Sequence, residues 1–194
     1  MKKTIEQYET IEVVGGQIMS RIVAKEEDTE FIRKVKVVVP KAITAEGFIM
    51  VEELIEEKIK SEPPVERITR EGDIVIKLST PFDTAFITKE TEGCVVPSFC
   101  AIIRNKGTLN IDYLRAFLAS KECKDQLKSK VIGAVMSILS ISRIKSVEIP
   151  DLDIEQQRKI GEHYREVQEK LQTMRQIIVL ENKRNDILFQ EISK

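Results

Sequence analysis

The sequence is poor in the residues that metal and acid–base sites use most: it has one histidine, three cysteines and no tryptophan. The cysteines, Cys94, Cys100 and Cys123, lack the spacing of a zinc site, and reduced thiols in a cytoplasm are their simplest interpretation. The histidine, His163, falls in a predicted helix, where a structural or solvent-facing role outweighs that of a general base. No glycine-rich phosphate loop is present. We therefore expect no catalytic residue, no metal and no cofactor.

Long apolar runs are also missing. No stretch approaches the roughly 18 apolar residues that a bilayer crossing requires, so a membrane span is excluded. The first seven residues turn acidic too early for a signal peptide. The sequence therefore predicts a cytoplasmic protein with no membrane partner.

An excess of positive charge is missing too, because the formal net charge is −1. This value argues against a broadly basic nucleic-acid binder, but the charges are unevenly spread. Residues 113–147 hold seven Lys or Arg against two acids, whereas residues 46–73 hold nine acids against four bases. Such asymmetry allows one face to meet a polyanion. Solvated helix faces would give similar counts, so the distribution alone does not identify a function.

The elements that can be predicted do not follow a strict βαβ order. Residues 51–60 have helical spacing, a helix opens at Asn110 or Asp112, and a short basic helix follows at 120–130. Strand-like stretches occur at 35–39, 73–78, 85–88, 94–103 and 147–149. This order favours an α+β fold with a mixed β-sheet in residues 1–150.

Residues 151–194 predict one long coiled-coil α-helix. Asp153 and Gln156 form a capping-box pattern at its start. Apolar residues then recur at alternating steps of four and three, which keeps one narrow seam facing a partner helix. The seam consists of Ile160, Tyr164, Val167, Leu171, Met174, Ile178, Leu188 and Ile192, with Glu181 and Asn185 in the two slots between.

A helix of this length, roughly 60 Å at about 1.5 Å per residue, cannot bury its seam on a domain of the preceding size. The chain offers no second helix of comparable length, so we expect dimerisation or partner docking through this helix. Asn185 at a core position would lower stability but fix register or orientation.

Three stretches resemble, in order, the specificity (S) subunit of Type I restriction–modification systems. Residues 72–77 read GDIVIK, and residues 110–120 read NIDYLRAFLAS. Residues 133–160 read GAVMSILSISRIKSVEIPDLDIEQQRKI and lead directly into the long helix. Residues 1–71 resemble the family only loosely. The family's tryptophan-containing opening is missing, and its proline-rich segment is reduced to residues 149–152.

The resemblance implies a target recognition domain that reads double-stranded DNA, followed by the family's spacer helix. In the family, two recognition domains are held apart by an antiparallel helix pair, and each reads half of a bipartite site beside docked methyltransferase subunits. This chain has one domain and one helix, so it resembles a half-subunit. A homodimer would then read a symmetric, spaced site and direct a methyltransferase subunit and a restriction subunit.

The DNA-binding residues that this resemblance implies lie in two places. Lys77, Ser79 and Thr80 follow the GDIV-like strand. The second group surrounds the Gly133 loop, and its cations and hydroxyls suit contacts to phosphates. This group consists of Lys128, Lys130, Gly133, Ser137, Ser140 and Arg143.

The sequence leaves two other classes of function open, a coiled-coil protein and a metal-dependent nuclease. A coiled-coil structural or regulatory protein without a DNA role would use the same helix. A metal-dependent nuclease would need Asp151 to meet Glu181 and Lys183 in a PD…ExK pattern around Mg²⁺. On one predicted helix these groups are separated by roughly 45 Å, which argues against the nuclease.

Overall fold

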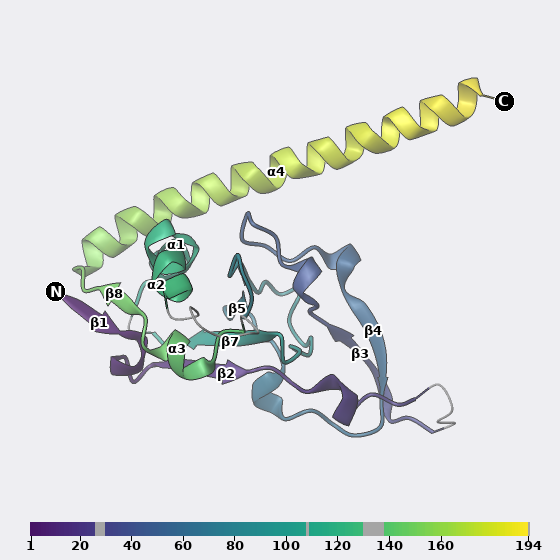
Figure 1. Cartoon of the computed structure of the whole chain (residues 1–194). Coiled ribbons are helices and arrows are strands. Elements are labelled where there is room, and N and C mark those ends of the chain that lie inside the picture. Colours follow the sequence, from purple (N-terminus) through teal and green to yellow (C-terminus); the bar gives the residue numbers. More distant parts are fainter. Residues whose placement is uncertain (26–29, 108, 130–137, 194) are drawn as a thin grey trace.

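The described strands form three antiparallel sheets, and one long helix crosses the globular part (Figure 1). The computed structural model describes residues 1–25, 30–107, 109–129 and 138–193. The central sheet has the order β2-β7-β5-β6. Its strands are β2 (Ile11–Gly15), β5 (Ile74–Lys77), β6 (Thr84–Phe86) and β7 (Cys100–Asn105). The α+β prediction is confirmed, and the parallel pairings are isolated bridges, Gln17–Pro97 and Val37–Val95.

Both faces of the central sheet are buried, which explains the nearly continuous apolar sequence of β5 and β7. Side chains alternate between two cores because successive residues of a strand point to opposite faces. Ile74 and Ile76 join the core that lies under the helices, and Val75 joins a second core on the other face.

Two small sheets flank this centre. β1 (Lys2–Thr4) pairs with β8 (Glu148–Pro150), and β3 (Arg33–Val37) pairs with β4 (Ile55–Ile59). The helix predicted for 51–60 is therefore wrong, since only Val51–Glu53 form a 3-10 turn, η4. The remaining 3-10 turns are η1 (Ile5–Gln7), η2 (Met19–Arg21), η3 (Pro40–Ala42) and η5 (Val65–Arg67).

Four α-helices complete the described chain: α1 (Ile111–Ala119), α2 (Lys121–Ser129), α3 (Ile141–Lys145) and α4 (Ile154–Ile192). Asn110 opens α1, since its side chain accepts a 3.0 Å hydrogen bond from the Tyr113 N–H. Ser120 links the first two helices, because its Oγ accepts from the Cys123 N–H at 3.2 Å. Among the described residues, no helix is both long and apolar enough to span a membrane.

The start of α4 carries the predicted capping box. The Gln156 N–H donates to Asp153 Oδ1 at 2.9 Å, and the Asp153 N–H donates to Gln156 Oε1 at 3.3 Å. From this point the helix continues without a break for 39 residues. The predicted long helix is therefore confirmed, and it begins at Ile154.

The first part of α4 lies on α1 (Figure 1). Gln157 is buried there, and its Oε1 accepts from the Asn110 N–H at 2.9 Å while its Nε2 donates to the Leu152 carbonyl. One turn later, Gly161 is buried directly against the N-terminus of α1. The globular part thus holds α4 through buried residues that are not members of the predicted seam.

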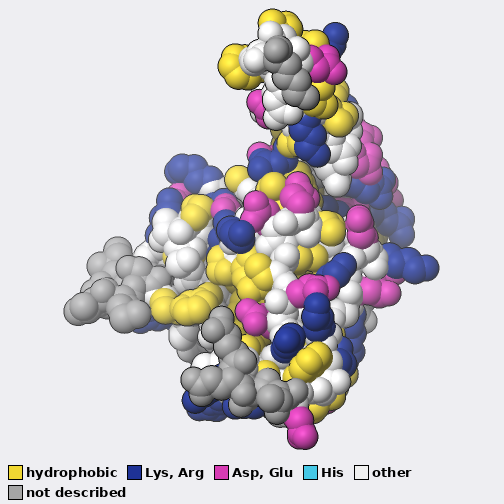
Figure 2. Space-filling model, turned by 90° about the vertical axis from the view of Figure 1, so that its right-hand side faces the viewer, with side chains coloured by type: hydrophobic (Ala, Val, Ile, Leu, Met, Phe, Trp, Pro, Cys, Tyr) yellow, Lys and Arg dark blue, Asp and Glu magenta, His cyan; other side chains and the backbone are white. Residues whose placement is uncertain are grey.

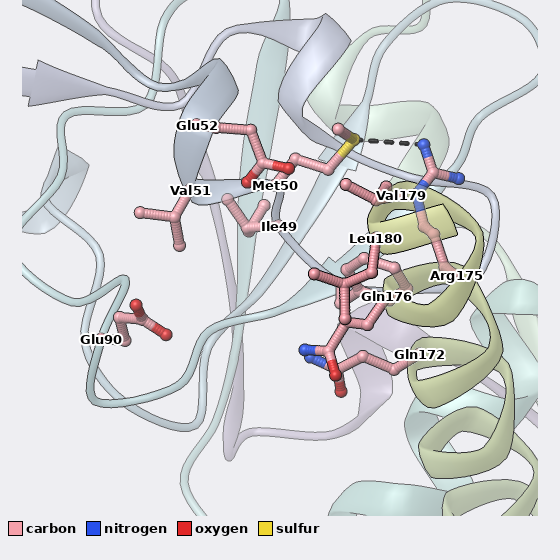
Figure 3. Close-up of a pocket in the computed structure, with 11 residues that line it drawn as sticks. Ile49, Met50, Val51, Glu52, Glu90, Gln172, Arg175, Gln176, Val179 and Leu180 are labelled. Carbon is pink, nitrogen blue, oxygen red and sulfur yellow. Dashed lines mark hydrogen bonds between the residues drawn. The ribbon is translucent and has the colours of Figure 1, made fainter. Parts of the chain in front are cut away.

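A second contact fixes α4 near its middle. Arg175 Nη1 is 3.2 Å from Glu46 Oε1. Its Nη2 donates to the Met50 sulfur at 3.2 Å, as Figure 3 shows. Beside this contact, a groove of about 410 Å³ separates α4 from residues 48–52. Beyond Leu180, which lines that groove, the helix projects from the globular part (Figures 1 and 2).

Candidate nucleic-acid interface

One end of the central sheet gathers chain segments that are distant in sequence. β2 ends there at Gly15 and β5 ends at Lys77, while β7 begins at Cys100. Hydrogen bonds continue beyond the strands: the Gly16 N–H binds the Cys100 carbonyl at 3.0 Å, and the Leu78 N–H binds the Phe99 carbonyl at 2.9 Å. We call the surface formed by residues 16–21, 65–67, 78–81, 97–99 and 138–143 the sheet-end surface.

Two segments join this surface through further hydrogen bonds. The Leu139 N–H donates to the Leu78 carbonyl at 2.7 Å, which places residues 138–143 beside the end of β5. Arg67 donates to Gln17 Oε1 at 2.8 Å, and Gln17 is itself buried. Gly16 fits because it lacks a side chain: a Cβ there would lie 2.8 Å from the Cys100 carbonyl oxygen. The surface is therefore built on a fixed backbone.

Lys77 forms part of a charge cluster below this surface. The Asp83 carboxylate binds Lys77 Nζ at 3.1 Å and Lys124 Nζ at 2.9 Å. Burial of Asp83 works to raise the pKa of its carboxyl, but the hydrogen bonds from the two lysines outweigh burial and hold that pKa below its usual value. Because two cations share one anion, the cluster carries a net positive charge.

The remaining predicted DNA-binding residues occupy different places. Ser79, Thr80 and Ser140 are exposed on the sheet-end surface, and Arg143 is half-buried in α3. Lys128 is exposed on α2, one turn beyond Lys124, and lies 4.0 Å from Asp125. The structure thus brings residues 138–143 of the second predicted group beside Ser79 and Thr80, whereas Lys128 is on α2. Lys130, Gly133 and Ser137 lie outside the described residues.

The GDIV-like motif has a structural role that the sequence did not reveal. Asp73 is buried and accepts two hydrogen bonds from Arg104 of β7, at 2.8 and 2.7 Å. It also accepts from the Arg70 N–H across a turn in which Gly72 has φ of 90°. These contacts lie at the opposite end of the sheet, so Asp73 fixes β5 against β7 rather than facing the sheet-end surface.

Sequence reasoning also missed Gln17, Arg67 and Phe99. Pro97 interrupts the stretch predicted as a strand, and it begins a turn in which the Cys100 N–H binds the Pro97 carbonyl at 2.9 Å. This turn exposes Phe99. The proline was therefore a usable signal, whereas the Arg67–Gln17 contact spans 50 residues and left no local pattern.

The predicted helix seam divides into two parts in the structure. Tyr164 and Val167 are half-buried, and the Tyr164 ring centroid lies 5.7 Å from the Arg115 guanidinium carbon. Burial raises the pKa of the Tyr164 hydroxyl. The other seam residues are exposed, namely Ile160, Leu171, Met174, Ile178, Asn185, Leu188 and Ile192. Their pairing with a partner helix stays a prediction.

The nuclease pattern does not converge. Asp151 precedes α4 and pairs with Lys3 at 2.9 Å, whereas Glu181 and Lys183 lie far along the unbroken helix. At about 1.5 Å per residue, the helix separates the two halves by roughly 40 Å. Among the residues that the structure describes, no three His, Cys, Asp or Glu side chains are grouped to hold a metal ion.

No protein-family profile matches this sequence, and a search of curated proteins also finds no match. Solved structures do match its fold. The HsdS subunit from Thermoanaerobacter tengcongensis aligns with a TM-score of 0.62 and 15% identity over 97% of this chain and 46% of that one.

Two further structures show the same relationship. A chain from a structure of complex assembly and conformational transition of the type I R-M system aligns with a TM-score of 0.60 and 17% identity, over 93% of this chain and 47% of that one. The Type-I restriction-modification system S subunit from M. genitalium gives 0.59 and 14%, over 97% and 44%. The chain thus has the fold of an S-subunit portion, and it spans less than half the length of these matches.

Proposed function

We propose, starting from this shared fold, that the chain is a non-catalytic DNA-specificity component of a Type I restriction–modification system. It reads double-stranded DNA through the sheet-end surface and assembles through α4, in the cytoplasm. The observation that carries the proposal is the alignment of 97% of the chain with 46% of an S subunit. Two copies would supply nearly the length of one such subunit.

The exposed stripe on α4 supports the homodimer. Met174 is 58% exposed, Ile178 is 61% exposed and Ile192 is 84% exposed, although all three are large and apolar. They fall on one side of the helix because they are separated by 4 and 14 residues, close to whole turns of 3.6 residues. A second α4 would cover this stripe, and a two-fold dimer would read two inverted half-sites.

The chemistry of the sheet-end surface supports DNA as the ligand. Hydroxyls of Ser79, Thr80 and Ser140 are exposed there, close to the cations Lys77 and Arg143. Hydroxyl groups and Lys or Arg side chains are among the protein groups that contact DNA phosphates. The partly neutralised Lys77–Asp83–Lys124 cluster adds positive charge without a compensating second acid.

Exposed apolar residues of α4 outside the predicted seam support docking of a methyltransferase subunit and of a restriction subunit. Ile177, Leu180 and Ile187 are all exposed and lie outside the predicted seam. Since one partner helix covers only a narrow seam, these residues can serve a different protein while the seam pairs two copies. The dimer and the methyltransferase would then share one helix without competing for the same residues.

Selection from a random duplex library tests this function, with the pure protein and again with a methyltransferase subunit of a Type I system. We expect enrichment of an inverted repeat with fixed spacing. Enrichment of one short half-site would retain DNA recognition but contradict the symmetric dimer. Enrichment of no sequence under either condition would favour the alternative, a coiled-coil scaffold, for which the projecting end of α4 is the supporting observation.

A further inference from the structure

The turn at residues 97–100 presents Phe99 to solvent from a rigid backbone. Phe99 is 60% exposed, yet its carbonyl accepts from the Leu78 N–H at 2.9 Å. On either side of it, the Ser98 N–H binds the Gln17 carbonyl at 2.8 Å, and the Cys100 N–H closes the turn. The phenyl ring is therefore exposed to solvent, although hydrogen bonds fix the backbone on both sides of it.

Phe99 belongs to an apolar group on the sheet-end surface. Ile18 follows Gln17, which binds this turn, and Ile138 precedes Leu139, which binds Leu78. Each of these isoleucines is 40% exposed. Single exposed apolar residues need no explanation, but a group of them on one rigid surface indicates a contact surface for a partner.

The surroundings of this group favour DNA over an apolar protein partner. The segments of the sheet-end surface carry the cations Arg21, Arg67 and Arg143, and Glu66 is their one acid. Exposed hydroxyls at Ser79 and Thr80 follow Leu78 directly. The segments that carry the apolar group thus hold three cations, one acid and exposed hydroxyls, in a chain whose net charge is −1.

We propose, on the basis of the function proposed above, that Phe99 contacts a base pair and recognises thymine. A phenyl ring offers no hydrogen bond, so it can distinguish base edges only by shape and apolar contact. In the major groove, the C5-methyl group of thymine is the apolar feature of the base edges. The cations and hydroxyls around the ring hold the phosphates, and Phe99 reads one position of the half-site.

The test uses the full chain and the duplex that the unaltered protein selects. Each thymine of the half-site is replaced in turn by uracil, which removes the C5-methyl group and keeps the base pair. We expect one replacement to weaken binding of the unaltered protein on the order of tenfold. Phe99→Ala should weaken binding to the thymine duplex by a similar factor and should not respond to that replacement.

Phe31→Ala is the matched control, because Phe31 is 42% exposed but lies before β3, outside the sheet-end surface. It should keep the sensitivity to uracil. Thermal unfolding of Phe99→Ala should match that of the unaltered protein, since the Phe99 side chain is exposed. The proposal would be overturned if Phe99→Ala still bound the uracil duplex more weakly than the thymine duplex. It would also be overturned if the substitution lowered the affinity for all duplexes by the same factor. Failure of the unaltered protein to select any duplex would instead refute the proposed function.

Discussion

Gly161 of α4 lies against Asn110, the residue that caps α1. A Cβ at position 161 would be 2.6 Å from Asn110 Oδ1 and 2.9 Å from the Tyr113 nitrogen, the two atoms that form the cap. The contact therefore joins the beginning of the long helix to the N-terminus of α1. It lies directly after residue 160, where the stretch that resembles the S subunit ends.

Gly161→Ala should destabilise the protein. Alanine is about 1 kcal/mol better than glycine inside a helix, but the added methyl group has no space and should cost about 1–3 kcal/mol. The free energy of unfolding in urea measures the balance, with Glu162→Ala as a control on the exposed side of the same turn. A Gly161→Ala protein that gains stability would show that the two helices can move apart.

Ile178→Asp should convert a dimer into a monomer without unfolding it. The side chain is 61% exposed in the single chain, so a carboxylate there meets only water until a partner helix approaches. Light scattering during gel filtration measures the mass. Asn182→Asp, an exposed position outside the seam, is the control and should remain a dimer. If Ile178→Asp also remains a dimer, the copies associate through another surface.

Lys128→Glu should weaken DNA binding and reduce its dependence on salt. Each lost phosphate contact lowers the slope of log affinity against log salt by about one. Titration of a labelled duplex at several salt concentrations gives this slope. Lys89→Glu changes the charge equally at the far end of the sheet, beyond β6, and should leave the slope unchanged. Equal slopes for Lys128→Glu and the unaltered protein would remove α2 from the DNA interface.

Asp83→Asn should lower stability at neutral pH but not in acid. The folded pKa of Asp83 is lowered, so its contribution is present above the usual carboxyl pKa and is lost as the pH falls through the folded value. Because the two lysines are only partly buried, we expect a loss on the order of 1–2 kcal/mol at pH 7. Unfolding measured from pH 7 down to pH 3 should show the two proteins converging; a constant difference would mean that packing, not charge, is responsible.

The buried thiols should resist alkylation until the protein unfolds. Burial raises the pKa of Cys100 and that of Cys123 to about 12, and a protonated thiol is a poor nucleophile. Iodoacetamide at pH 8 should label neither residue in the folded protein and both in urea, as mass spectrometry would show. The same shift affects stability: because the thiol pKa is higher in the folded protein, the stability that the protonated thiols contribute is complete below the ordinary thiol pKa. That stability is lost as the pH rises toward 12. Rapid labelling of the folded protein would contradict this burial.

Local patterns predicted the parts of the fold that depend on local contacts. The capping box at Asp153 and the long helix after it depend on residues a few positions apart, and both are confirmed. Of the two residues predicted to open α1, Asn110 and Asp112, the structure has Asn110 as the cap. The helix predicted for residues 51–60 is wrong because their helical spacing competes with pairing to β3, which lies about 20 residues earlier. Ile59 is buried with Val35 and Val37, and this distant contact decides the structure.

The candidate site was only partly predictable for the same reason. The sequence placed Lys77 and Ser140 in separate regions, and nothing local shows that the Leu78 carbonyl binds the Leu139 N–H. The register of β2, β5 and β7 creates the sheet-end surface, and a register is a property of strand pairs. Phe99 was missed because its exposure depends on the turn that the neighbouring strands impose.

The pairing of β1 with β8 brings the beginning of the globular part beside its end. Thr4 faces Glu148, and the Asp151 N–H binds the Met1 carbonyl at 3.0 Å, just before α4 begins. The chain between β1 and β8 therefore begins and ends at neighbouring positions, close to the start of α4 (Figure 1). Exchange of the chain segment between these two junctions would therefore replace the whole central sheet and the sheet-end surface in one step, while leaving α4 unchanged.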